Sequence, residues 1–331
     1  MPFRDIAGHE QLKRLIARAA LRGTLPPSLI FAGPAGVGKR MAALALAQLV
    51  NCLSPVDDDA CGVCASCGRI ARGVHADVVI VEPGDTGAIK IEQVRDIIDR
   101  AAYRPFEGRR RVVIIDNADQ IVPNAQDALL KTLEEPPSGT TFVLVSSVPE
   151  TLLPTIRSRC QRLRFGRLSP ADVAGVLLRG HAYSSADAHA AAAFSDGSVG
   201  RALEGSSDAF VEARGAALEL LETVADEPPP ARRILGASGL PGAGRSKADR
   251  DALAQSLRAL ATILRDLGIL GSHADERALA NADLTKRLER LLRAFDRARI
   301  LRAFAAVDRA LNALDRNASP KIVADWLAFQ I

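Results

Sequence analysis

The sequence predicts an α/β domain built on a parallel sheet with a phosphate loop, followed by an all-α region. Short β-rich runs alternate with helical patterns in the first half, a glycine-rich loop joins the first strand to a helix, and the β-rich runs stop after about residue 167. Alternation of strands and helices favours a parallel sheet because each helix forms a crossover between neighbouring strands. We therefore expect an α/β domain over residues 1–166 and helical domains over residues 167–228 and 245–331.

Five short β-rich runs predict the strands of the sheet. They cover residues 29–32, 77–81, 112–115, 142–145 and 162–165. Apolar residues at helical spacing predict three helices between these strands. The helices cover residues 39–50, 91–102 and 124–133. The last of them ends before Pro136 and Pro137, because proline cannot continue a helix.

The second half of the sequence is rich in alanine, leucine and arginine at helical spacing, which predicts helices only. Ser169 followed by Pro170 is typical of an N-cap and the first residue of a helix. The proline-rich residues 226–230 and the Gly- and Ser-containing residues 236–247 predict a break. The break separates a small middle domain from a C-terminal bundle that begins near Ala248.

Composition limits the classes of protein to which the chain can belong. The chain has 331 residues and a formal net charge of +4, which is too small to predict nucleic-acid binding by itself. No run reaches the roughly 18 apolar residues that a membrane helix needs. The first residues lack the basic and apolar pattern of a signal peptide. We therefore expect a cytoplasmic protein without a membrane partner.

Four of the five cysteines lie within sixteen residues and include two overlapping Cys-x-x-Cys steps. They are Cys52, Cys61, Cys64 and Cys67. In a cytosolic chain such a cluster favours one structural Zn²⁺ held by four thiolates over disulfides. A redox motif is an alternative that the third and fourth cysteines disfavour, and a nucleic-acid contact by the zinc knuckle remains open. Cys160 is isolated, and we expect it to be a small buried residue.

Residues 33–40, Gly-Pro-Ala-Gly-Val-Gly-Lys-Arg, lie between a predicted strand and a predicted helix, the context that a phosphate loop requires. The candidate nucleotide-binding residues of this loop are Gly33, Gly36, Gly38 and Lys39. Arg40 follows the lysine, where a Ser or Thr would bind Mg²⁺. Two interpretations remain open: the loop binds ATP or ADP without hydrolysing ATP, or it is a tight glycine turn that the fold needs.

A second nucleotide-site element follows the strand at 112–115. This strand ends in Asp116, the position of a carboxylate that holds Mg²⁺ in phosphate-loop ATPases. The next residue is Asn117, which is neutral and a poor base for activating a water molecule. Both the metal site and the water site are therefore compromised, and we expect little or no ATP hydrolysis by this chain.

Four segments of the first half resemble bacterial clamp-loader AAA+ subunits of DNA polymerase III. They are residues 33–39, residues 116–119, Asp-Ala-Leu-Leu-Lys-Thr-Leu-Glu-Glu-Pro-Pro at 127–137, and Leu-Pro-Thr-Ile-Arg-Ser-Arg-Cys at 153–160. The cysteine insertion at 52–67 is similar to the zinc module of that group, although the family commonly has Asn in place of Asp127. The resemblance implies an AAA+ core with a zinc knuckle, a small helical lid and a C-terminal helical collar in a five-subunit ring.

The resemblance also implies roles for two arginines. Arg159, in Ser-Arg-Cys, would act in trans as an arginine finger on the ATP of a neighbouring subunit, the alternative being a surface ion pair. Arg201, in Gly-Ser-Val-Gly-Arg, resembles the sensor-2 residue that faces the subunit's own nucleotide, the alternative being a tie between lid and core. A basic run at Arg104 and 109–111 could touch DNA phosphates, although a solvated turn is the simpler interpretation.

The implied partners are the clamp-loader subunits tau or gamma and delta, the sliding clamp, and primed DNA within the assembled loader. Motor subunits of the family would carry Ser or Thr after the loop lysine and an acidic residue after the Walker B aspartate. This chain has Arg40 and Asn117 at these positions, so it looks like a stator that supports the ring without hydrolysing ATP. An active ATPase resembling tau or gamma remains the alternative.

Overall fold

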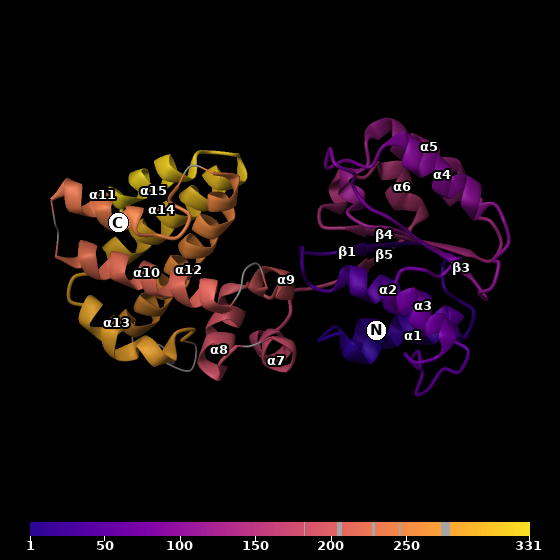
Figure 1. Cartoon of the computed structure of the whole chain (residues 1–331), viewed down its shortest axis with the longest axis horizontal. Helices are drawn as coiled ribbons and strands as arrows, with labels where there is room; N and C mark the ends of the chain where they lie inside the picture. Colours follow the sequence, from indigo (N-terminus) through magenta and orange to yellow (C-terminus); the bar gives the residue numbers. More distant parts are fainter. Residues whose placement is uncertain (182, 204–206, 227–228, 245, 273–278) are drawn as a thin grey trace. The chain divides into compact units, whose positions relative to one another are not determined.

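The computed structural model describes residues 1–181, 183–203, 207–226, 229–244, 246–272 and 279–331. The chain forms two compact units (Figure 1). The first unit contains Met1–Ser169 together with Ser198–Gly200, and the second contains Pro170–Gly197 and Arg201–Ile331. The first unit ends three residues beyond the predicted end of the α/β domain.

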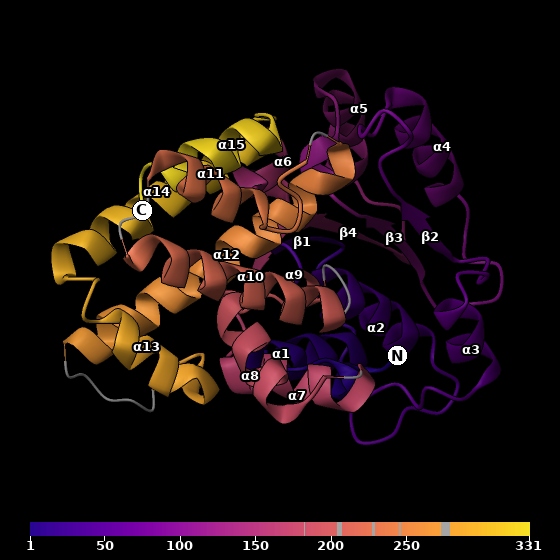
Figure 2. The same ribbon diagram turned by 60° about the vertical axis from the view of Figure 1, so that its left-hand side comes forward.

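A five-stranded parallel sheet forms the centre of the first unit. Its strands are β1 (Ser28–Ala32), β2 (Val78–Val81), β3 (Arg111–Ile115), β4 (Thr140–Ser146) and β5 (Gln161–Arg164). They are arranged in the order β2-β3-β4-β1-β5, and every pairing is parallel. Figure 2 shows β2, β3, β4 and β1 side by side in this order. The prediction of a parallel α/β domain is therefore confirmed. Every residue of β1, β3 and β4 is buried, because both faces of a parallel sheet are covered by helices.

Helices cover both faces of this sheet. Their bounds are α1 (Glu10–Leu21), α2 (Lys39–Asn51), α3 (Ala65–Ala71), α4 (Ile91–Ala101), α5 (Pro123–Glu134) and α6 (Pro154–Arg159). Short 3-10 turns occupy Phe3–Asp5, Ala118–Gln120 and Pro149–Thr151. The helices α1, α2 and α3 lie on one face of the sheet, and α4, α5 and α6 lie on the other (Figure 1).

Alternate residues of β1 contribute to the two hydrophobic cores. Leu29 and Phe31 pack with residues of α1, α2 and α3, whereas Ile30 and Ala32 pack with residues of α4, α5 and α6. The first core also includes Cys52 and Cys67, so the cysteine module is packed against the sheet domain.

The described residues of the second unit are helical and contain no strand. The helices are α7 (Pro170–Gly180), α8 (Ser185–Phe194), α10 (Ser207–Ala225), α11 (Pro230–Ser238), α12 (Lys247–Gly271), α13 (Thr285–Leu291), α14 (Arg297–Asp315) and α15 (Pro320–Ala328), with a 3-10 turn at Ala282–Leu284. The short helix α9 (Val199–Ala202) has its first two residues in the first unit and its last two in the second. The long helix α12 packs against both α10 and α14. No described helix is long and apolar enough to span a bilayer.

The predicted break between the helical domains coincides with two gaps between helices. Helix α10 ends at Ala225 and α11 begins at Pro230, while α12 begins at Lys247, one residue before the predicted start of the bundle. Three residues of this region lie outside the described residues: 227, 228 and 245. Residues 227 and 228 belong to the predicted break, and 228 and 245 are predicted domain bounds. Apart from residues 167–169 and 198–200, which belong to the first unit, both predicted helical domains fall within the second unit. The division into a lid at 167–228 and a collar at 245–331 therefore stays a prediction.

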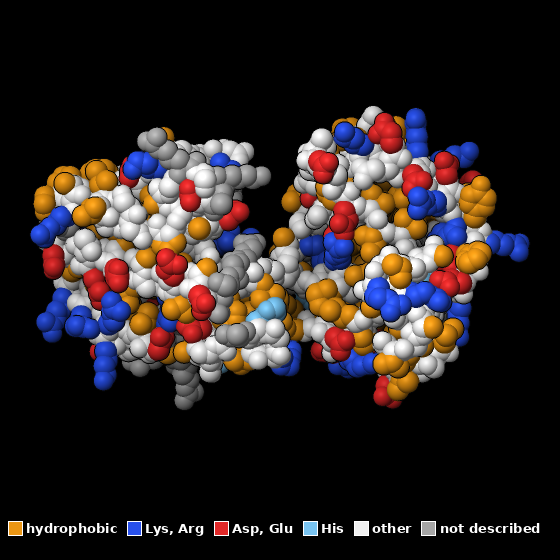
Figure 3. Space-filling view, viewed as in Figure 1, with side chains coloured by type: hydrophobic (Ala, Val, Ile, Leu, Met, Phe, Trp, Pro, Cys, Tyr) orange, Lys and Arg blue, Asp and Glu red, His pale blue; other side chains and the backbone are white. Residues whose placement is uncertain are grey.

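Acidic and basic side chains are interspersed over the visible face of each unit (Figure 3). This mixture is consistent with the small net charge of +4.

Candidate nucleotide and metal sites

The glycine-rich loop connects β1 to α2, as predicted, and its backbone requires glycine at specific positions. Gly36 and Gly38 have φ angles of 72° and 96°, in the left-handed region that favours glycine. A Cβ atom on Gly33 would lie 2.0 Å from the carbonyl oxygen of Phe165. The loop also contacts Ser198 of the same unit, whose hydroxyl donates to the carbonyl of Ala35 at 2.8 Å. These contacts fix the shape of the loop.

Lys39, the first residue of α2, is turned toward the loop itself. Its Nζ donates to the carbonyl oxygens of Gly33 and Pro34, at 2.6 Å each, and to Oγ of Ser147 at 3.1 Å. Burial lowers the pKa of Lys39, while Asp119 and Asp116 oppose that change. A phosphate could pair with the Lys39 ammonium group only by displacing the carbonyl oxygens of Gly33 and Pro34 from it.

Arg40 forms ion pairs with two carboxylates beside the loop. Its Nη1 lies 3.1 Å from Oδ2 of Asp116, and its Nη2 pairs with Glu82, which follows β2. The Asp116 side chain is only 10% exposed, whereas that of Arg40 is 47% exposed. A guanidinium group therefore neutralises the carboxylate that would hold Mg²⁺ in a phosphate-loop ATPase.

The residue after Asp116 also departs from an active ATPase site. Asn117 has φ 49° and ψ 50°, a left-handed conformation that asparagine tolerates better than most residues. Its backbone N–H donates to Oδ1 of Asp116 at 3.0 Å, and its side chain is exposed. The described residues between β3 and α5 thus place a neutral amide where a general base would be needed.

A polar contact at the end of β4 connects this region to Lys39. The backbone N–H of Ser147 donates to Oδ1 of Asp119 at 2.9 Å. Burial disfavours the charged form of Asp119, but hydrogen bonding, led by this bond from Ser147, outweighs burial and lowers the pKa of the carboxyl. The carboxylates of Asp116 and Asp119 are thus close to a buried lysine and a partly exposed arginine.

Arg159, the predicted arginine finger, is the last residue of α6. Its Nη1 donates to the carbonyl of Thr155 at 2.9 Å, and its Nη2 pairs with Glu134, the last residue of α5. This pair is the surface ion pair that the sequence analysis kept as an alternative. Since a role in trans needs a second subunit, the role of Arg159 as a finger stays a prediction.

Two further sequence features have clear positions in the fold. Arg201 belongs to the second unit, where it forms an ion pair with Asp196 at 3.8 Å, and its sensor-2 role stays a prediction. Cys160 is buried, as expected, and burial raises the pKa of its thiol to about 12. A thiol of this kind is not a nucleophile at neutral pH.

The four clustered cysteines come together in space. Their sulfur atoms all lie within 4.8 Å of one another, and all are free thiols. Cys52 follows the last residue of α2, Cys61 lies in the connecting loop, Cys64 caps the N-terminus of α3, and Cys67 lies within α3. Four sulfur donors in one compact cluster fit the tetrahedral coordination of a structural zinc ion.

Backbone N–H groups point at three of the sulfur atoms. Cys61 donates to Cys52 Sγ at 3.3 Å, Cys64 donates to Cys61 Sγ at 3.3 Å, and Cys67 donates to Cys64 Sγ at 3.5 Å. The backbone N–H of Cys64 is the main cause that lowers the pKa of Cys61 to about 6. Burial raises the pKa values of Cys52 and Cys67. A divalent cation would stabilise the thiolate form of Cys61, whose pKa is lowered, and of Cys52 and Cys67, whose pKa values are raised.

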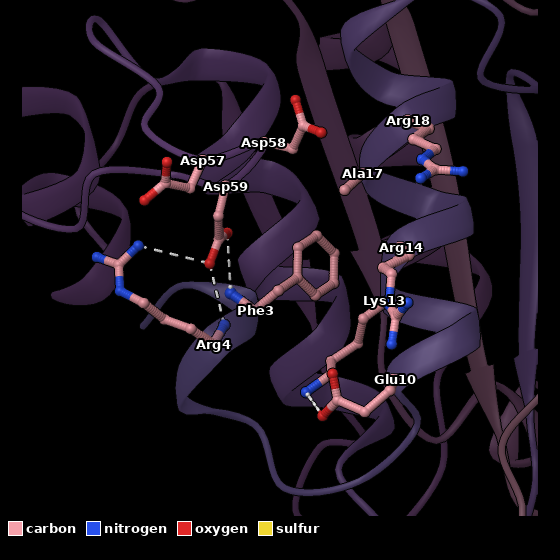
Figure 4. A pocket seen from close by; sticks show the side chains of 10 residues that line it. All are labelled: Phe3, Arg4, Glu10, Lys13, Arg14, Ala17, Arg18, Asp57, Asp58 and Asp59. Carbon is pink, nitrogen blue, oxygen red and sulfur yellow. Dashed lines mark hydrogen bonds and ion pairs between the residues drawn. The ribbon is translucent and has the colours of Figure 1, made fainter.

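An acidic turn connects the cysteine module to the N-terminal segment. Asp59 Oδ1 accepts from the backbone N–H of Phe3, and its Oδ2 accepts from that of Arg4, at 3.0 Å each (Figure 4). The Arg4 guanidinium in turn donates to the carbonyls of Ala60 and Cys61 at 2.8 Å each. The sequence analysis missed these residues because their contacts join segments more than fifty residues apart.

A cavity of about 290 Å³ lies between this turn and α1. Asp57 and Asp58 have φ angles of 51° and 58° and form the two central residues of a tight turn closed by Val56 and Asp59. Figure 4 places the three aspartates on one side of the cavity, with the basic side chains of α1 on the other. Lys13, on the α1 side, is already satisfied by the carbonyl of Ile6 at 2.6 Å and by Glu10 at 2.7 Å.

The structure brings together most of the residues predicted from the sequence. Gly33, Gly36, Gly38 and Lys39 form one loop. Arg40 connects this loop to Asp116, and the four cysteines form a second cluster. Glu82 was missed as a partner of Arg40, since nothing in the sequence around it marks it as a site residue.

Comparison with known proteins finds similarity to subunits of DNA polymerase III. Residues 8–169 match the family model described as "DNA polymerase III, delta subunit". DNA polymerase III subunit tau of Bacillus subtilis is 35% identical over 173 residues, which are 52% of this chain and 30% of that protein. DNA polymerase III subunit delta' of Pseudomonas aeruginosa is 42% identical over 129 residues, which are 39% of each chain.

The matched segments thus span about a third of the length of these relatives. The family-model match at residues 8–169 includes the parallel sheet, the phosphate loop and the cysteine cluster. Through these segments, the chain is similar to subunits of bacterial DNA polymerase III.

Proposed function

We propose that this chain is a delta-prime-type subunit of the DNA polymerase III clamp loader. In this role it supports ATP-dependent loading of the sliding clamp onto primed DNA, with little or no ATP hydrolysis of its own. Its partners would be the tau or gamma subunits, the delta subunit, the sliding clamp and primed DNA. The observation that carries the proposal is the ion pair between Arg40 and Asp116 at 3.1 Å.

This ion pair argues against hydrolysis on physical grounds. Mg²⁺ in a phosphate-loop site needs the carboxylate after the strand and a hydroxyl after the loop lysine. Here the hydroxyl is replaced by the Arg40 guanidinium, and the same guanidinium neutralises Asp116. The exposed amide of Asn117 provides no base for the attacking water. A nucleotide at this loop would lack both its metal and its activated water.

We further propose that Arg159 acts in trans on ATP bound by a neighbouring subunit. The Arg159 side chain is one-third exposed and lies at the end of a short helix. A partly exposed ion pair such as Arg159 with Glu134 contributes only about 0–1 kcal/mol. Exchanging it for a γ-phosphate would therefore cost little, while a fixed cation stabilises the charge that develops in phosphoryl transfer.

The test is ATP hydrolysis by the reconstituted loader, stimulated by the clamp and primed DNA, with Arg159→Ala in this subunit. Arg162→Ala is a matched control, because Arg162 is a similarly exposed arginine that pairs with Glu150 at 3.2 Å. We expect Arg159→Ala to silence the site that it completes, since arginine fingers contribute roughly 10³- to 10⁵-fold. The control should retain the wild-type rate. Equal rates for all three assembled loaders would overturn the role of Arg159.

One observation favours a second candidate function, that of an active ATPase resembling tau or gamma. A 173-residue stretch of the chain is 35% identical to a tau subunit, and the loop retains Gly36, Gly38 and Lys39 in place. Hydrolysis by the purified chain, compared with an Arg40→Thr/Asn117→Glu variant, separates the two functions. A gain of activity only in the variant supports the stator, whereas activity in the wild type supports the ATPase.

We also propose that Cys52, Cys61, Cys64 and Cys67 hold one structural Zn²⁺. The sulfur cluster and the backbone N–H groups that point at it support this site. The zinc would cross-link α2 to α3 beside the first core. Cys67→Ser tests the alternative of a nucleic-acid contact. Loss of folding would indicate a structural ion, whereas loss of DNA binding with an intact fold would indicate a binding module.

A further inference from the structure

The loop at residues 102–110, between α4 and β3, exposes two aromatic side chains and yet has a firmly held backbone. Tyr103 is 73% exposed and Phe106 is 85% exposed. Exposed aromatic side chains on an irregular loop would be expected to lie on a mobile segment. Here the loop is held by polar side chains from three other parts of the first unit.

Asp77, directly before β2, is the first of these anchors. Its carboxylate is fully buried and accepts from the backbone N–H groups of Phe106, Glu107 and Gly108 at 2.7–2.8 Å. Burial disfavours its charged form, but these bonds and the Arg111 guanidinium lower the pKa of Asp77 to about 2. The carboxylate is therefore ionised at neutral pH.

Arg111 completes this anchor from the other side. Its Nη2 donates to Asp77 at 2.9 Å, while its Nη1 donates to the carbonyl oxygen of Tyr103 at 2.9 Å and to that of Arg100. One buried guanidinium thus connects the end of α4, the loop and the start of β2. Charge-assisted bonds of this kind are among the stronger contacts in proteins.

The second anchor is Asn51, the last residue of α2. Its side-chain amide pairs with both the backbone N–H and the carbonyl of Arg110, at 2.9 Å each. Gly108 packs so closely that an added Cβ would lie 2.5 Å from Asn51 Oδ1. Asn51 directly precedes Cys52, one of the four clustered cysteines.

The third anchor is α3, the helix that carries Cys67. Arg69 of α3 forms an ion pair with Glu107 of the loop at 2.8 Å. Ser66 Oγ lies 3.2 Å from Nε2 of His75, whose Nδ1 accepts from the backbone N–H of Asp77 at 3.1 Å. Because Nδ1 accepts, Nε2 carries the proton and donates to Ser66.

We propose that metal occupancy of the cysteine cluster holds the loop at 102–110 in its ordered conformation. The inference rests on the proposed zinc site. Asn51 and Arg69 contact the loop directly, and Ser66 contacts His75, which holds Asp77. Each of Asn51, Ser66 and Arg69 lies one or two residues from Cys52 or Cys67. A metal ion that fixes these two cysteines also fixes the positions of the three anchoring side chains. Loss of the ion lets α3 separate from α2 and weakens the hold on the loop.

Hydrogen–deuterium exchange of the full chain tests this coupling, with zinc content measured on the same samples. Chelation should accelerate exchange of the Phe106, Glu107, Gly108 and Arg110 amides at least about tenfold, the change expected from losing one charge-assisted bond. The amides of Phe142 and Leu144 in β4 should remain protected, which distinguishes a local opening from unfolding.

A variant tests the same contacts with zinc still bound. Ser66→Ala/Arg69→Gln removes the polar contacts of α3 without touching a cysteine, and Arg72→Gln is the control, an exposed arginine at the end of α3. The double variant should keep one zinc and lose loop protection, and the control should lose neither. If the zinc-loaded double variant exchanged its loop amides at the wild-type rate, the coupling between the metal site and the loop would be overturned. This result can be read even if chelation unfolds the whole unit, because the variant keeps its zinc.

The outcomes also separate this inference from the proposed zinc site. A chain that binds no zinc overturns the metal site and with it metal control of the loop. A chain that binds one zinc and keeps full loop protection after chelation overturns the coupling alone.

Discussion

Replacement of Arg40 by threonine should restore Mg²⁺ to the phosphate loop. A Mg²⁺ ion at its usual distance of about 2.1 Å from Asp116 Oδ2 would lie within about 5 Å of Arg40 Nη1, which is 3.1 Å from that oxygen. At an effective dielectric constant of about 20, the repulsion between these charges is about 7 kcal/mol. Arg40 would therefore have to leave Asp116 before Mg²⁺ could bind.

The cost of moving Arg40 sets the expected effect. The Arg40 side chain is about half exposed, so breaking its pair with the more buried Asp116 costs about 1–2 kcal/mol after allowance for solvent screening. A change of 1.4 kcal/mol corresponds to a factor of about ten in affinity. Threonine also supplies the hydroxyl that Mg²⁺ prefers at this position. We expect Arg40→Thr to bind nucleotide at least about tenfold more tightly when Mg²⁺ is present.

Calorimetric titration of ATP with and without Mg²⁺ measures this effect. Arg40→Lys is the matched control, because it keeps a positive charge at this position and should gain no Mg²⁺ dependence. Equal Mg²⁺ dependence in wild type and Arg40→Thr, or no nucleotide binding by either, would refute the reasoning.

Three further predictions concern stability and metal content. Asp77→Asn should lower the free energy of unfolding at pH 7 by about 2 kcal/mol, because the pKa of Asp77 is lowered to about 2 in the folded chain. That contribution is complete above the ordinary aspartate pKa of about 4 and is lost as the pH falls toward 2, so urea unfolding of variant and wild type should converge there. A difference between the unfolding free energies of variant and wild type that grows as the pH falls would contradict this prediction. Gly33→Ala should cost at least about 2 kcal/mol, because its Cβ would lie 2.0 Å from the Phe165 carbonyl, whereas Gly84→Ala, with no atom within 4 Å, should change stability little. Similar midpoints of urea unfolding for Gly33→Ala and Gly84→Ala would contradict this prediction. Atomic spectroscopy should find one zinc per chain, and chelation should lower the midpoint of thermal unfolding; a metal-free chain of unchanged stability would exclude a structural ion.

The sheet was largely predictable from the sequence, since β1, β3 and β4 are buried on both faces and read as continuous apolar runs. The prediction started β2 one residue early, at Asp77. Its carboxylate instead binds the loop before β3, a contact between segments about thirty residues apart. The sequence analysis did not predict α1, α3 and α6, and two of these are short helices of six and seven residues.

The candidate sites were predictable in part. Arg40 and Asn117 were recognised as departures from an ATPase, because their residue types are wrong for the chemistry. The direct contact of Arg40 with Asp116 and Glu82 joins the start of α2 to the ends of β3 and β2, so it could not be predicted without the folded sheet. The cysteine cluster was predictable from spacing alone. The anchors Asn51, Ser66 and Arg69 were not, because nothing in the local sequence indicates what they contact.

The most direct test of the central claim is ATP hydrolysis by the reconstituted loader, stimulated by the clamp and primed DNA. It compares Lys39→Ala with Arg159→Ala in this subunit after assembly has been verified. The proposed function predicts a wild-type rate for Lys39→Ala, because this chain's own loop is silent, and a reduced rate for Arg159→Ala. A reduced rate for Lys39→Ala together with an unchanged rate for Arg159→Ala would contradict it and would identify this chain as an active ATPase.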